Sequence, residues 1–139
     1  MNNASGMNCG THANSDKELL SAKIVLADGT RLNTGDPESR MTFEKNHTPF
    51  LNKIIEIRDE IRNDNELSDR IRKKYSIKNV TGLNLLPFVI YDDPFDIIAH
   101  LMVGSEGTLA FLSEVTMKTE HDYPYSCLLY TSPSPRDAH

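Results

Sequence analysis

The sequence is poor in cysteine, in long apolar runs and in excess positive charge, and each shortage excludes a class of protein. Its two cysteines, Cys9 and Cys127, are too few for a disulfide framework, and their spacing matches no zinc site. No apolar run approaches the roughly 18 residues that would span a bilayer. The net charge of −5 argues against nucleic acid as a partner, because surfaces that bind nucleic acid are usually basic.

Signals for export and for metal binding are also missing. The N-terminus lacks the basic and apolar pattern of a signal peptide, which predicts a cytoplasmic protein, with association with the cytoplasmic face of a membrane as an alternative. His100 is one helical turn from Asp96, which favours an i,i+4 side-chain pair over a catalytic dyad. The histidines share no metal-ligand spacing, and we predict a surface or core role for four of them: His12, His47, His100 and His121.

The composition that remains is that of one globular domain. The chain has 139 residues, of which 38% are hydrophobic and 25% charged. Two apolar and β-branched runs flank the dipeptide Asp28-Gly29, which predicts a hairpin with a type I′ turn and strands at about Ser21–Ala27 and Thr30–Asn33. Alternation after Leu109 predicts a further strand, with Phe111 and Val115 on one face.

Apolar residues at helical spacing predict three helices between these strands. The first spans Thr48–Asn63 and has a proline at its first turn, and the second spans about Asn65–Tyr75. The third begins at Pro94 after the capping residue Asp93, and it is apolar on most of its circumference, which predicts burial on more than one side. Strands at both ends and helices between them indicate an α+β fold rather than a doubly wound parallel sheet.

The last fourteen residues differ in composition from the rest of the chain. Residues 126–139 are rich in Ser, Pro and Thr, and nothing in them continues the preceding strand. The stretch from Cys127 to Asp137 looks like the translation of a sequencing-library adapter, which predicts a non-native tail; a disordered Pro-rich tail is the alternative. We expect residues 1–125 to be a partial domain, truncated at both ends.

A loop with two glycines, VGSEGTL at residues 103–109, precedes the last predicted strand. Ser105 lacks the preceding glycine of a nucleophile elbow, and no Gly-Lys-Ser/Thr follows as in a P-loop. A dinucleotide fingerprint opens a helix, whereas this loop opens a strand. Two interpretations remain: a backbone that lies against a flat or anionic group, or a tight turn that requires glycine.

Two other stretches carry candidate binding residues. Residues 3–11 are also small and polar and precede a strand, which suggests that this loop and residues 103–109 line one ligand. Basic residues gather at the end of the second predicted helix, at Arg70, Arg72, Lys73, Lys74 and Lys78. A phosphate or membrane-surface patch is one interpretation, but interspersed acidic residues favour a solvated helix face.

The two loops together resemble a known family. Two stretches resemble the second half of the FAD-binding domain of p-cresol-methylhydroxylase-type (PCMH-type) flavoproteins, the vanillyl-alcohol-oxidase-like group. They are NNASGMNCGTHANSDKELLSAKIVLADG and MVGSEGTLAFLSEVTMKT. A third stretch resembles the large FAD-linked dehydrogenases that oxidise D-lactate and glycolate. It reads IKNVTGLNLLPFVIYDDPFDIIAHLMVGSEGTL. The resemblance covers residues 1 to about 125 and implies the second subdomain of a PCMH-type FAD-binding domain with a helical insertion.

The resemblance implies FAD-binding residues in both loops. The residues along the flavin and pyrophosphate would be Asn3, Ala4, Ser5, Gly6 and Gly10. The facing wall would be formed by Gly104, Ser105, Glu106, Gly107 and Leu109, with Leu112 reaching the adenine. A less closely matching stretch near the flavin contains Lys78, Thr81 and Gly82. The sequence departs from the family pattern at Asn8 and Leu83, which leaves the subfamily open.

The implied activity is oxidation of a 2-hydroxy acid such as D-lactate, with FAD as the hydride acceptor and a further electron acceptor. Neither the family's first subdomain nor its substrate-binding cap has a counterpart here, so no catalytic residue is implied and the chain alone is expected to be inactive. An iron–sulfur cluster in a following domain is a further expectation. Two alternatives remain: a sugar-lactone oxidase or cell-wall-precursor reductase of the same fold, and a non-catalytic domain that docks a partner through residues 49–63.

Overall fold

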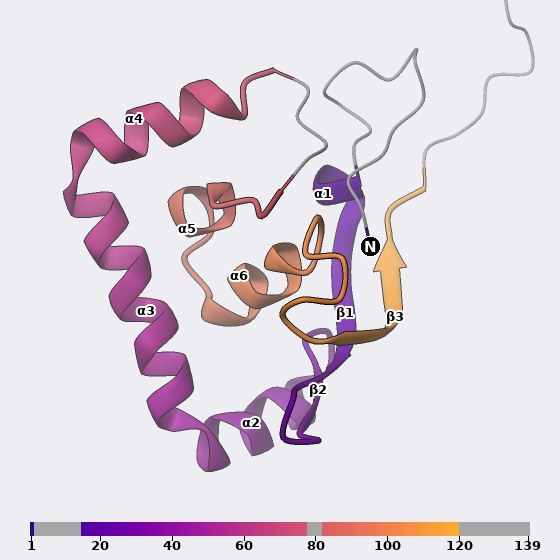
Figure 1. Ribbon diagram of the computed structural model, residues 1–139. Helices are drawn as coiled ribbons and strands as arrows, with labels where there is room; N and C mark the ends of the chain where they lie inside the picture. Colours follow the sequence, from indigo (N-terminus) through magenta and orange to yellow (C-terminus); the bar gives the residue numbers. More distant parts are fainter. Residues whose placement is uncertain (2–14, 78–81, 120–139) are drawn as a thin grey trace, which may run out of the picture.

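The computed structural model describes Met1, residues 15–77 and residues 82–119. Figure 1 shows a small sheet with helices stacked against one of its faces. The sheet is antiparallel, with β1 (Leu19–Val25) between β2 (Arg31–Asn33) and β3 (Phe111–Met117). This arrangement confirms the predicted α+β class. Residues 126–139, for which a non-native tail is predicted, lie outside the described residues.

The helices form two layers beside the sheet. In chain order they are α1 (Ser15–Glu18), α2 (Pro37–Asn46), α3 (Thr48–Asn63), α4 (Asn65–Lys74), α5 (Leu86–Ile90) and α6 (Pro94–Leu101). α6 packs against β1, and the long helix α3 lies beyond α5 and α6, farther from the sheet (Figure 1). The three helices predicted from the sequence are confirmed as α3, α4 and α6, whereas α2 and α5 were not predicted.

Aspartate caps explain where three of the helices begin. The Asp36 carboxylate accepts a hydrogen bond from the Glu38 N–H at 3.1 Å, and Asp93 accepts one from the Phe95 N–H at 2.8 Å. Asp64 accepts one from the Leu67 N–H at 3.0 Å. These contacts satisfy amide groups that have no partner within the helix, so each start is encoded locally.

The hairpin between β1 and β2 is present, but its turn differs from the one predicted. The Leu26 N–H donates to the Thr30 carbonyl at 2.8 Å, and the Gly29 N–H donates to the Leu26 carbonyl at 2.9 Å. The loop therefore has three residues, and within it Gly29 has a positive φ of 86° while Asp28 does not. The predicted type I′ turn is wrong because that turn needs positive φ at both central residues.

β3 departs from the strict alternation predicted for it. Its register passes from Glu114 to Leu112 opposite consecutive residues of β1, so Ser113 is the extra residue of a β-bulge. Leu112 and Val115 consequently both pack against the core although they are three positions apart. Phe111 is 68% exposed. The prediction that Phe111 shares a face with Val115 is therefore wrong.

Two apolar clusters lie on opposite sides of α6. The first fills the space between the sheet and α6 and includes Ile24, Leu32 and Ile98. The second lies between α6 and the outer layer of helices and includes Ile61 and Ile97. Because the neighbouring residues Ile97 and Ile98 belong to different clusters, α6 is buried on more than one side, as predicted.

Candidate cofactor-binding site

The loop between α6 and β3 has an unusual backbone. Three of its residues have positive φ, at 83° for Gly104, 51° for Glu106 and 81° for Gly107. Residues other than glycine rarely adopt this conformation, because the Cβ atom crowds the backbone. The loop therefore needs its glycines for conformation alone, before any ligand is considered.

Hydrogen bonds inside the loop hold this backbone in place. The buried Ser105 hydroxyl donates to the Met102 carbonyl at 2.8 Å. The Thr108 side chain and backbone N–H both donate to the Ser105 carbonyl, at 2.6 and 3.0 Å. Ser105, a predicted cofactor contact, thus uses its hydroxyl within the loop.

Gly104 brings three distant segments of the chain together. Its N–H donates to the carbonyl of Met1 at 2.7 Å. A Cβ atom at Gly104 would lie 2.8 Å from the backbone carbonyl oxygen of Gly82. That spacing is too short for a real contact, so the approach of Gly82 requires glycine at position 104. Met1 directly precedes the first predicted loop, and Gly82 ends the less closely matching stretch.

The predicted site residues divide into two groups. Those that lie outside the described residues are Asn3, Ala4, Ser5, Gly6, Gly10, Lys78 and Thr81. Gly82 and the second loop lie within the described part of the chain. Of that loop, Glu106, Gly107 and Leu109 are exposed, whereas Leu112 sits in β3 and packs partly against the core.

The exposed part of the loop offers donors and open space. Among the described residues, the backbone N–H groups of Glu106 and Gly107 make no hydrogen bond. A Cβ atom at Gly82 or Gly107 would have nothing within 4 Å. Leu83, which follows Gly82, is 48% exposed. Free amides beside exposed apolar surface are suited to a flat, anionic ligand.

His100 has the core role predicted for it, but its partners differ from the one predicted. Its Nδ1 atom lies 2.7 Å from the backbone carbonyl oxygen of Asp96, and its Nε2 atom lies 3.2 Å from that of Leu19. The Asp96 carboxylate instead lies 3.6 Å from the Arg40 guanidinium. The predicted side-chain pair between Asp96 and His100 is therefore wrong, and the buried imidazole joins α6 to β1.

A small polar cluster beside His100 was not predicted. The Tyr91 ring stacks on the His100 ring with centroids 4.2 Å apart, next to a cavity of about 70 Å³ that Asp16 and Asn84 also line. Burial, and then the negative charges of Asp16 and Asp96, raise the pKa of Tyr91. No local pattern reveals this cluster, because Asp16 is far along the sequence from Asn84, Tyr91 and His100.

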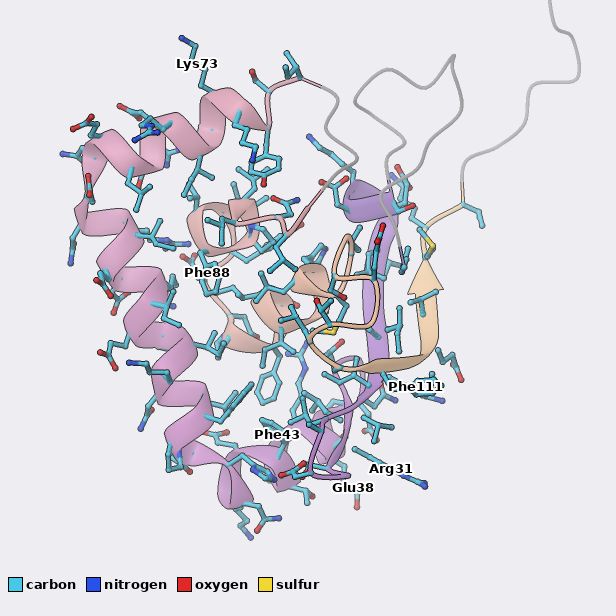
Figure 2. The ribbon with its side chains drawn as sticks, viewed as in Figure 1. Arg31, Glu38, Phe43, Lys73, Phe88 and Phe111 are labelled. Atoms are coloured by element: carbon cyan, nitrogen blue, oxygen red, sulfur yellow. The ribbon has the colours of Figure 1, made fainter. Side chains whose placement is uncertain are left out.

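Wider hollows lie away from the glycine loop. One of about 510 Å³ lies between α2, α3 and the start of α6, and includes Arg40 and Phe95 in its lining. Another of about 500 Å³ lies over the strands, and its lining includes Arg31 and Phe111. Figure 2 labels both side chains. Within the described residues, no group of three or more His, Cys, Asp or Glu is arranged to hold a metal ion. In the same part of the chain, no helix is long and apolar enough to cross a membrane.

Comparison of the chain with protein-family models, with curated proteins and with solved structures finds no match.

Proposed function

We propose that this chain is part of a FAD-dependent oxidoreductase of the PCMH type that oxidises a 2-hydroxy acid. The observation that carries the proposal is the meeting of Met1, Gly82 and Gly104. The resemblance implies FAD contacts in or beside all three segments, and nothing local in the sequence requires those segments to meet.

The described residues fit such a cofactor in two respects. The N–H groups of Glu106 and Gly107, which make no hydrogen bond to a described residue, are donors suited to an anionic or carbonyl-bearing group. No atom of the described residues would lie within 4 Å of a Cβ at Gly82 or Gly107, which leaves the backbone accessible to a planar ring on that side. FAD, when bound, supplies the hydride acceptor, and the chain's own residues bind and orient it.

The alternative of a non-catalytic domain relied on an apolar face of α3 that would dock a partner. Leu51 and Ile61 of α3 are buried, and other apolar residues of the helix pack within the same two clusters. The apolar face of α3 therefore stabilises this domain itself. A partner that docks on that face would have to displace α5 and α6.

A pair of glycine substitutions tests the proposal in a protein extended upstream by the first FAD-binding subdomain. Gly107→Ala and Gly29→Ala are matched, because both positions have positive φ and neither Cβ atom would meet anything within 4 Å. Strain at positive φ costs each variant about 1–2 kcal/mol of folding stability. We expect Gly107→Ala to lose bound FAD, measured by flavin absorbance per protein, and Gly29→Ala to retain it.

The outcomes separate a cofactor role from a turn role. Equal FAD content in the two variants would mean that Gly107 serves the loop conformation alone. An extended protein that folds but binds no FAD at all would refute the proposed function. If FAD binds, a panel of 2-hydroxy acids and sugar lactones then distinguishes the proposed dehydrogenase from the alternative flavoenzymes.

A further inference from the structure

β3 forms one edge of the sheet. Within the described residues it pairs with β1 alone. The Lys118 N–H donates to the carbonyl of Glu18 at 2.7 Å, toward the β1 side. Because backbone groups alternate in direction along a strand, those of Met117 and Val115 point away from β1. In the part of the chain that the structure describes, these two outward positions have no partner strand.

The side chains of this edge are arranged in a self-complementary pattern. Val115 and Met117 pack against the core on one face. The exposed residues of the edge are Glu114, Thr116 and Lys118. The negative Glu114 lies two positions before Thr116, and the positive Lys118 lies two positions after it. Glu114 forms an exposed ion pair with Lys23 at 3.0 Å, and within the described part of the chain Lys118 forms none.

We propose that β3 pairs antiparallel with β3 of a second copy of this chain, about a two-fold axis at Thr116. Each Glu114 then lies opposite Lys118 of the second copy, and each Val115 lies opposite its Met117. The outward backbone groups at positions 115 and 117 face one another across the axis, as an antiparallel ladder requires. The sheet becomes continuous through the dimer, with one surface meeting itself.

Other registers of the same two strands are less favourable. A two-fold axis at Glu114 places two carboxylates opposite each other, and an axis at Val115 places Leu112 opposite Lys118. Like charges opposite one another destabilise a strand pair, whereas opposite charges stabilise it. The β-bulge at Ser113 also limits flat pairing to residues 114–118, since bulges interrupt an edge.

Charge exchange tests this register directly. Glu114→Lys places lysines opposite lysines at two symmetric points, and Lys118→Glu places glutamates opposite glutamates. We expect each variant to weaken dimerisation about tenfold, since two attractive pairs become repulsive. The double variant Glu114→Lys/Lys118→Glu restores opposite charges in the same register and is expected to dimerise as the unmodified chain does. Analytical ultracentrifugation over a concentration series gives the dissociation constants.

A matched control separates the interface from the ion pair inside each copy. Lys23→Gln removes the Lys23–Glu114 pair and leaves both interface charges in place, so we expect it to dimerise normally. Circular dichroism checks that every variant remains folded. A chain that is monomeric up to about 500 µM, or a dimer that the single exchanges do not weaken, would overturn the proposal. Failure of the double variant to restore dimerisation would overturn the register.

Discussion

Thr34 completes the pairing of β1 with β2 just beyond the end of the shorter strand. Its backbone N–H donates to the Ala22 carbonyl at 2.9 Å, and its side-chain oxygen accepts a hydrogen bond from the Ala22 N–H at 3.0 Å. The residue is 1% exposed. A side chain thus replaces a backbone acceptor in the ladder.

Replacing Thr34 with valine keeps the shape of the side chain and removes the acceptor. We expect the free energy of unfolding to fall by about 1–3 kcal/mol, because the buried Ala22 N–H is left without a partner. Urea denaturation followed by circular dichroism measures the change. The control is Thr42→Val on the exposed surface of α2, for which we expect less than about 1 kcal/mol. Equal losses in both variants would contradict the role assigned to Thr34.

The two glycines of the candidate site serve different needs at the residue scale. Gly104 combines positive φ with a close approach of the Gly82 carbonyl, so the fold itself demands glycine there. Gly107 has positive φ and open space around it. The spacing of Gly104 and Gly107 in the sequence does not show which glycine avoids a close contact and which only adopts positive φ. The atoms around each glycine in the structure show this.

At the scale of elements, Arg62 of α3 holds the end of α5. Its Nε–H donates to the Phe88 carbonyl at 3.0 Å, and its Nη2–H donates to the Tyr91 carbonyl at 2.7 Å. Its Nη1 atom pairs with the Asp92 carboxylate at 2.5 Å. The hydrogen bond from Arg62 and its positive charge lower the pKa of Asp92. Carbonyls at the end of a helix lack partners within it, so the cation from the neighbouring helix satisfies them.

Substitution of Arg62 by methionine is expected to loosen α5. The two carbonyls lose a charged donor, and we expect a loss of about 1.5–3 kcal/mol in the free energy of unfolding. Native-state hydrogen exchange of α5 amides measures the local effect. Arg72→Met is the control, because among the described residues Arg72 makes a single exposed ion pair, with Asp69 at 3.6 Å. Unchanged exchange in α5 would show that its packing alone holds it.

The helices that escaped prediction did so for identifiable reasons. α2 begins with the same Asp-Pro signal as α6, at Asp36 and Pro37, but Phe43 is its one buried residue, so no apolar stripe marks it. α5 has five residues, too few for a helical period to be read. The helices with a repeated apolar stripe were predicted closely, because that stripe is the face that packs against the rest of the domain.

At the scale of the whole molecule, α6 couples the two apolar clusters. Ile97 is 0% exposed in the cluster toward α3, and Ile98 is 2% exposed in the cluster toward the sheet. A domain with two apolar clusters unfolds in one cooperative step only if disrupting one cluster also disrupts the other. A helix that packs in both clusters couples them in this way.

Conservative truncations in α6 test this coupling. We expect Ile97→Val and Ile98→Val each to lower the free energy of unfolding by about 0.5–1.5 kcal/mol. Circular dichroism in the far ultraviolet follows the whole domain, whereas Tyr75 and Tyr91 pack against one cluster and their fluorescence follows that cluster. If the clusters unfold together, both signals should give the same urea midpoint in both variants. Midpoints that separate in either variant would show that the clusters unfold independently.

The sequence by itself determined the features that depend on near neighbours along the chain. The aspartate caps, the reversal of direction at Gly29 and the apolar stripes of α3, α4 and α6 all arise from contacts within a few residues. The class of fold followed from their order.

Only the tertiary structure decided what depends on distant residues. The bulge at Ser113 changed which side chains of β3 face the core, because pairing with β1 and packing against α6 act together there. The meeting of Met1, Gly82 and Gly104 likewise depends on how α6 and its neighbours pack. Local preferences choose the conformation of a segment, but which segments touch is decided by burial of the whole core.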